Sequence, residues 1–193
     1  MTPFQQHVKR WENCQKCHYC KHRTRVVIGR GKLPAEILFV GEAPGKSENS
    51  LGIPFSGPSG QLLDHIIERA GISDKRLYFT NLVCCIPIEE LEPGIFAKAT
   101  EPDDEAIKAC RPRLEELIKI ANPKLIVCVG SVAADYLDRT VRNPVKIPEG
   151  CEINKIVHPS FILRSNVATR ELKIQQCAVA LANSVEEIDE QNQ

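Results

Sequence analysis

Residues 36–63 read EILFVGEAPGKSENSLGIPFSGPSGQLL, and the expected architecture follows from this stretch. Its first five residues, Glu36–Val40, form a short apolar run that is typical of a buried central strand. Glycines and prolines interrupt every periodic pattern over 41–58, so we predict a shaped loop there. Apolar residues return at helical spacing over Ser59–Ala70, with Ser59 as the expected N-cap. A glycine-rich loop between a strand and a helix is where open α/β sheets bind ligands.

Three further apolar runs have the character of strands, and helical patterns alternate with them. The runs are Leu77–Val83, Lys124–Val129 and Glu152–Val157. Helices are expected over Pro3–Glu12, Asp103–Ile120, Ser131–Leu137 and Asn166–Asn183. This alternation predicts an α/β fold, a three-layer α/β/α sandwich with a central four-stranded, mainly parallel sheet. We expect one domain over residues 1–193, which includes the N-terminal cysteine segment 1–32.

Composition and charge narrow the class of protein. The chain has 193 residues, is 42% hydrophobic and carries no net charge. It has no run of about 18 apolar residues, the length a membrane helix needs, and Met1–Arg10 lacks the apolar centre of a signal peptide. We therefore expect a cytoplasmic protein that does not bind membranes. Basic residues dominate the first 32 positions and acidic residues dominate the C-terminal end, and either patch is as well explained by a solvated surface as by a binding surface.

Nine cysteines in such a chain favour metal or cluster ligation over disulfides. Cys14, Cys17 and Cys20 form a C-x-x-C-x-x-C string, a spacing that brings thiolates to one centre. The spacing alone suits zinc, an iron–sulfur cluster or a redox dithiol.

Further ligands must come from other parts of the chain. One of the adjacent residues Cys84 and Cys85, together with Cys110 in an expected helix, would complete a set of four thiolates. Cys128 lies inside an expected strand and Cys177 inside the last expected helix, so we assign both to the core.

Polar residues follow three of the expected strands. Glu42 comes after the first strand, Asn81 lies near the end of the second, and His158 follows the fourth. Because parallel strands end at the same edge of a sheet, we expect these side chains to lie close together.

Residues 41–48 read GEAPGKSE, residues 80–85 read TNLVCC and residues 158–164 read HPSFILR. These three motifs resemble those of the uracil-DNA glycosylase superfamily, and specifically of its iron–sulfur-containing family four. The motifs occur in the family's order, and with the cysteines they span about residues 14–164. The resemblance implies a monomeric, monofunctional enzyme that flips uracil out of single- or double-stranded DNA and hydrolyses its N-glycosidic bond, which starts base-excision repair.

The resemblance also implies roles for individual residues. The cofactor would be a 4Fe-4S cluster, held by Cys14, Cys17, Cys85 and Cys110. Phe55 would stack on uracil, and the Asn81 amide would match the O4 and N3–H edge of the base. His158 would donate a hydrogen bond to O2, where negative charge develops. Glu42 would orient the attacking water or stabilise the cationic sugar.

The remaining site residues would contact the base or the DNA. Gly41 and Glu48 complete the uracil site, with Glu48 crowding the 5-position so that thymine is refused. The DNA contacts implied are Ser59, Ser160, Ile162, Leu163 and Arg164, with Leu163 or Ile162 as a wedge and Arg164 on a phosphate.

Two features depart from the family pattern. Asn49 stands where the family has an aspartate, and the lost negative charge would weaken water activation. An acidic loop over residues 89–105 replaces a short basic one and would repel a DNA phosphate track at low salt. The loop either points away, binds a protein partner or reflects another substrate. The alternative functions are therefore a catalytically altered iron–sulfur relative that binds DNA or protein, and a zinc or redox protein unrelated to DNA.

Overall fold

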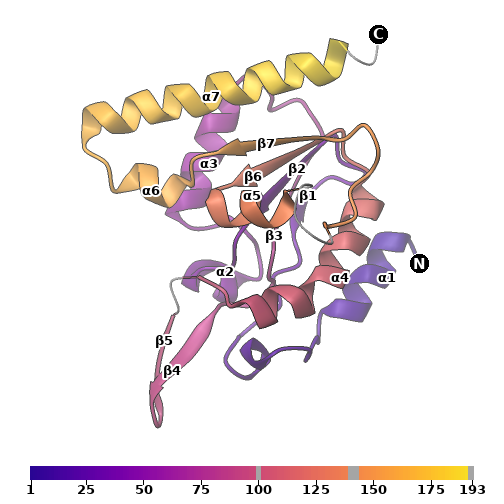
Figure 1. Cartoon of the computed structure of the whole chain (residues 1–193), viewed down its shortest axis with the longest axis vertical. Coiled ribbons are helices and arrows are strands. Elements are labelled where there is room, and N and C mark those ends of the chain that lie inside the picture. Colours follow the sequence, from indigo (N-terminus) through magenta and orange to yellow (C-terminus); the bar gives the residue numbers. More distant parts are fainter. Residues whose placement is uncertain (99–100, 139–143, 191–193) are drawn as a thin grey trace.

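A central sheet organises the chain in the computed structural model, which describes residues 1–98, 101–138 and 144–190 (Figure 1). The sheet has five strands in the order β1-β3-β2-β6-β7. The bounds of the strands are β1 Arg30–Gly31, β2 Ile37–Gly41, β3 Leu77–Asn81, β6 Leu125–Val129 and β7 Glu152–Ile156. Strands β3, β2, β6 and β7 are parallel, and β1 pairs antiparallel with β3. All four expected strands are confirmed, but the expected number was wrong, because a two-residue edge strand has no sequence pattern.

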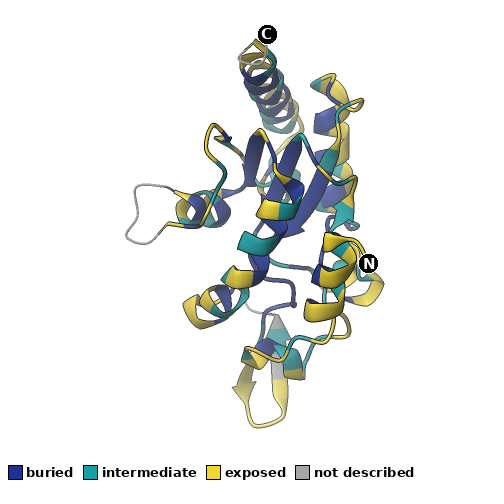
Figure 2. Cartoon of the chain, turned by 90° about the vertical axis from the view of Figure 1, so that its right-hand side faces the viewer, coloured by how far each residue is buried: buried dark blue, intermediate teal, exposed yellow. Residues whose placement is uncertain are grey.

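Helices cover both faces of the sheet, which confirms the three-layer α/β/α fold. The first layer contains α3 (Pro58–Arg69), α6 (Pro159–Leu163) and α7 (Val167–Glu190). The second contains α1 (Pro3–Trp11), α4 (Asp104–Ala121) and α5 (Ser131–Leu137). Alternate residues of β2 point to opposite layers, as the period of a strand requires: Phe39 packs in the first and Leu38 in the second. Figure 2 shows the buried strands between these exposed helices.

Several elements differ from the sequence-based expectation. The expected loop contains a short helix, α2 (Lys46–Leu51), which starts after Gly45 and ends at Gly52 in the left-handed conformation (φ 78°). The glycines that argued against a helix are in fact its two ends. The N-cap of α3 is Gly57, so the assignment of this cap to Ser59 was wrong.

The acidic segment also has regular structure. Its first part forms a hairpin of β4 (Ile88–Glu92) and β5 (Ile95–Lys98) that projects away from the sheet (Figure 1). The side chains of residues 89–95 are exposed. No helix among the described residues is long and apolar enough to cross a membrane.

The N-terminal cysteine segment is fastened to the rest of the fold at three places. Trp11 Nε1 donates to Glu116 of α4 at 2.7 Å. The hydroxyl of Tyr19, in the 3-10 helix η1 (His18–Lys21), donates to Asp103, the N-cap of α4, at 2.5 Å. Thr24 and Asn49 form a reciprocal pair of hydrogen bonds, which fastens the segment to α2.

Candidate active site

A cavity of about 680 Å³ opens at the carboxyl ends of the parallel strands. Residues from four strand ends line it: Glu42 after β2, Asn81 of β3, Gly130 after β6 and His158 after β7. The parallel sheet therefore brings Glu42, Asn81 and His158 to one edge, as their positions at the ends of strands predicted.

Phe55 and Asn81 lie against Gly41 on one side of this cavity. Phe55 is only 8% exposed, and its ring lies edge-on to Phe79 with the centroids 6.0 Å apart. A Cβ built on Gly41 would lie 2.4 Å from Asn81 Oδ1 and 2.7 Å from Phe55 Cζ. Only glycine at this position leaves room for the aromatic ring and the amide together.

His158 is oriented by the first turn of α6, of which it is the N-cap. Its Nδ1 accepts a hydrogen bond from the Ser160 backbone N–H at 3.1 Å and lies 2.8 Å from Ser160 Oγ. Because a backbone N–H can only donate, Nδ1 is an acceptor and the proton of the neutral imidazole is on Nε2. The ring therefore offers a donor at Nε2.

Two half-buried carboxylates line the cavity, Glu42 and Glu48. The Gly57 backbone N–H donates to Glu48 Oε1 at 3.2 Å. A Cβ on Gly45 would lie 2.6 Å from Glu48 Oε2. The Glu48 carboxylate is thus held between the two loops that enclose α2.

The expected DNA-contacting residues separate into two groups. Ser59, Ser160 and Arg164 line the cavity. Leu163 is half-buried, whereas Ile162 is fully buried in the core between α3 and α7. Ile162 is therefore not available as a wedge.

The structure adds an aromatic residue that the sequence reasoning missed. Phe161 lines the cavity, is 53% exposed and carries Lys173 Nζ over its ring, 4.1 Å from the centroid. The helical period could have identified it, because residues three apart share a helix face and Arg164 was already placed outside.

The structure places the two departures from the family pattern differently with respect to the cavity. The Asn49 side chain is bonded to Thr24, and Asn49 is not among the residues that line the cavity. The expectation that Asn49 weakens water activation therefore has no contact to support it. From the acidic segment, Glu101 lines the cavity, whereas no described residue of the β4–β5 hairpin does.

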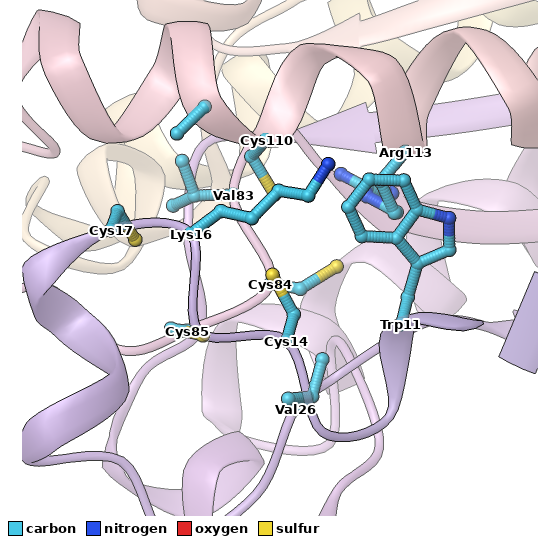
Figure 3. A pocket seen from close by; sticks show the side chains of 11 residues that line it. Trp11, Cys14, Lys16, Cys17, Val26, Val83, Cys84, Cys85, Cys110 and Arg113 are labelled. Atoms are coloured by element: carbon cyan, nitrogen blue, oxygen red, sulfur yellow. The ribbon is translucent and has the colours of Figure 1, made fainter. Parts of the chain in front are cut away.

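A second cavity brings together cysteines from three separate parts of the chain (Figure 3). The cysteines that line it are Cys14, Cys17, Cys84, Cys85 and Cys110. Among the described residues, no group of three or more His, Cys, Asp or Glu side chains is placed to hold a metal ion. Cys128 and Cys177 lie in the core, as expected.

Comparison with known proteins identifies the family of this chain. The model of the Uracil DNA glycosylase superfamily matches residues 28–182. A Type-4 uracil-DNA glycosylase of Thermotoga maritima is 33% identical over 165 residues, which cover 81% of each chain. This chain belongs to the Type-4 uracil-DNA glycosylase family. A Type-4 enzyme of Sulfurisphaera tokodaii is 38% identical over 126 residues, 65% of this chain and 53% of the relative.

A solved structure supports the same fold. The crystal structure of wild-type Pedobacter heparinus SMUG2 matches with a TM-score of 0.62 over 79% of this chain and 76% of that one. At 16% identity, the likeness concerns the fold alone.

Burial and neighbouring groups set the thiol chemistry of the cysteine cavity in this Type-4 chain. Burial raises the pKa of the Cys85 thiol to about 12 and also raises the pKa of Cys17. The pKa of Cys110 is lowered, first by a hydrogen bond with Cys84 and further by the Arg113 guanidinium. The surroundings of Cys110 therefore favour its ionised form more than those of Cys17 and Cys85.

Proposed function

We propose that this protein is a monofunctional uracil-DNA glycosylase, which flips uracil out of DNA and hydrolyses its N-glycosidic bond as the first step of base-excision repair. The observation that carries the proposal is the meeting of an aromatic ring, a planar amide and an Nε2–H donor in one cavity of a Type-4 family member. Each of the three matches a different part of a flipped uracil.

Phe55 and Asn81 select the base. The buried Phe55 ring supplies a stacking surface, and the Asn81 amide has one acceptor for N3–H and one donor for O4. Cytosine offers the opposite pattern on this edge, so it would leave buried polar groups unpaired. Gly41 leaves room for both side chains beside it.

His158 and Glu42 serve the chemical step. Bond cleavage places negative charge on uracil O2 and positive charge on the sugar. His158 Nε2–H donates to O2, and a preorganised donor of this kind contributes about 3–4 kcal/mol of transition-state stabilisation. Glu42 orients the attacking water or stabilises the cationic sugar from the end of β2.

Glu48 and the surface around α6 complete the recognition of substrate. Glu48, held by Gly57, crowds the 5-position and refuses the methyl group of thymine. Ser59, Ser160 and Arg164 contact the DNA backbone. Leu163 remains the proposed wedge, and exposed Phe161 joins it.

The cysteine cavity is suited to a 4Fe-4S cluster with Cys14, Cys17, Cys85 and Cys110 as ligands. Thiolates are the ligands that such clusters take, and this cavity gathers all four of them beside the apolar side chains of residues 11, 26 and 83. When bound, the group supplies a structural crosslink. The four thiols would join the N-terminal segment and the end of β3 to α4, so their loss unfolds that region.

The acidic hairpin β4–β5 is a candidate surface for a protein partner. Glu89, Glu90 and Glu92 are exposed on it beside exposed Leu91 and Ile95. The hairpin projects away from the sheet (Figure 1), and none of these exposed side chains lines the active-site cavity. The hairpin is therefore suited to bind a protein partner with a basic and apolar surface. We expect the glycosylase itself to act as a monomer.

The deciding experiment is cleavage of an end-labelled single strand with one uracil, after incubation with the protein and then alkali. A strand with thymine in place of uracil is the substrate control. We expect cleavage only at uracil, abolished by His158→Ala and by Asn81→Ala. The matched control is His65→Ala, at an exposed position on α3 outside the cavity. A folded, brown protein that leaves the uracil strand intact would instead favour a catalytically altered DNA- or protein-binding relative.

A further inference from the structure

Arg113 is a buried, charged side chain. It lies between the cysteine cavity and the end of β3, which carries Asn81 into the active-site cavity. It lies on α4 one turn after Cys110 and is only 1% exposed. Its side chain lines the cysteine cavity, beside Cys110 on the same helix (Figure 3). A guanidinium is costly to bury, so its partners indicate what it does.

The partners of Arg113 are consecutive residues at the carboxyl end of β3. Nη1 donates to Thr80 Oγ1 at 2.8 Å, and this hydroxyl donates in turn to the Ile28 carbonyl at 2.8 Å. Nη2 donates to the backbone carbonyls of Asn81 and of Leu82, the latter at 2.9 Å. The guanidinium thus holds the Thr80 side chain just before Asn81 and the backbone carbonyls of Asn81 and Leu82.

This point of β3 needs a side-chain partner because the regular ladder ends there. The last register pair between β2 and β3 joins Gly41 and Asn81. Beyond it, the Leu82 N–H donates to the Gly41 carbonyl at 2.9 Å. The Asn81 and Leu82 carbonyls face the guanidinium instead, and a buried carbonyl without a donor costs about 1–3 kcal/mol.

The other side of Arg113 faces the thiols. Arg113 acts on Cys110 through its charge and through a side-chain hydrogen bond. Its Nε is buried and has no hydrogen-bond partner in the described part of the chain. The Arg113 side chain therefore lies between Cys110 on α4 and the carbonyls at the end of β3.

We propose that Arg113 is a positioning residue for base recognition. From the wall of the cysteine cavity, it holds the backbone at Asn81 and thereby fixes the Asn81 amide in the active-site cavity. The inference rests on the proposed function, in which Asn81 reads uracil. It makes recognition of the base sensitive to the packing of α4 around the cysteines. Lysine cannot replace arginine here, because one ammonium on a flexible chain does not reproduce a planar guanidinium that donates to three acceptors at once.

The test compares Arg113→Lys and Arg113→Met with the same two substitutions at Arg111, in the full-length protein. Arg111 is on the same helix but bonds Glu115 at 2.9 Å, away from both cavities. The measurements are kcat and KM on a uracil strand, inhibition by free uracil, and hydrogen exchange of the Leu82 and Val83 amides. Thermal unfolding and binding to an abasic strand report stability and DNA contact.

For Arg113→Lys, we expect the inhibition constant for free uracil and the KM to be at least tenfold higher than in the wild type. The Leu82 and Val83 amides should exchange faster. Binding to the abasic strand should be unchanged. The Arg111 variants should match the wild type. A folded Arg113→Lys protein with unchanged uracil inhibition overturns the inference, even if its stability falls. If Arg113→Met does not fold, Arg113→Lys decides. A wild-type protein that does not excise uracil overturns the proposed function, and the exchange rates then decide alone whether Arg113 fixes the end of β3.

Discussion

Gly130 packs directly against His158 in the active-site cavity. A Cβ built on Gly130 would lie 3.1 Å from His158 Cβ and 3.3 Å from Cδ2. Gly130 also has a φ of +100°, a conformation that residues with side chains rarely adopt. The residue that follows β6 thus sets the position of the imidazole that follows β7.

Replacing Gly130 by alanine should therefore displace His158 and slow uracil excision. The backbone strain costs on the order of 1–3 kcal/mol, and the new methyl group presses on the imidazole. A donor moved from its place loses much of its effect on the transition state, so we expect a loss of about tenfold to a hundredfold in the single-turnover rate.

Gly150→Ala is the control for strain alone. Gly150 has a φ of +74°, and no atom lies within 4 Å of a Cβ built on it. This variant should lose stability and keep the excision rate of the folded protein. Equal rates for Gly130→Ala and wild type would show that the contact does not orient His158.

Ser160→Ala tests whether the Ser160 hydroxyl orients His158. The change removes the hydroxyl 2.8 Å from Nδ1 and keeps the backbone N–H at 3.1 Å. One neutral hydrogen bond contributes about 1 kcal/mol, so we expect the single-turnover rate to fall about threefold to tenfold. Ser165→Ala, at the end of α6, is the control. If only DNA affinity falls, Ser160 contacts the backbone and does not orient the imidazole.

The sequence was sufficient for the four parallel strands of the sheet and for the polar residues at their ends. β2 and β6 consist of consecutive buried residues, which no amphipathic helix resembles. Asn81 and His158 follow such runs, so their convergence needed only the rule that parallel strands end together. The sequence did not reveal two elements that lack a periodic pattern, the two-residue strand β1 and the short helix α2.

Arg113 escaped for a different reason. An arginine in a helical pattern normally indicates a solvated face, and only tertiary contacts reveal a buried guanidinium. A signal existed nevertheless, since Arg113 lies three residues after Cys110 and one before fully buried Leu114. A charged residue in the middle of an apolar helix face indicates a buried partner, here the end of β3.

Substitution of single cysteines should identify the ligands in the cysteine cavity. Cys17→Ser and Cys85→Ser should remove iron and brown colour and make the protein precipitate, because the crosslink to α4 is lost. Cys84→Ser and Cys20→Ser should keep both iron and colour, even though Cys84 lines the same cavity. The measurements are iron content and visible absorbance. Iron that survives in Cys85→Ser but not in Cys84→Ser would move the ligand to Cys84.

His7 should make stability depend on pH. The imidazole is fully buried between α1 and α4, with Nδ1 3.4 Å from Glu116 Oε2. Its pKa is lowered, chiefly by burial and then by Arg113, while Glu116 opposes the shift. The unfolded chain, with an ordinary pKa of about 6.5, binds a proton that the folded protein refuses. The free energy of unfolding should therefore fall as pH drops from about 7, by at most about 1.4 kcal/mol per pH unit for this one group.

Urea unfolding at several pH values between about 5 and 8 measures this dependence. His7→Leu removes the titrating group and fills a similar volume, so its free energy of unfolding should change less over the same interval. Exposed His65→Leu, on α3, is the control and should retain the wild-type dependence. If His7→Leu and the wild type lose stability in parallel, another group carries the dependence, and the buried imidazole accepts its proton without unfolding the protein.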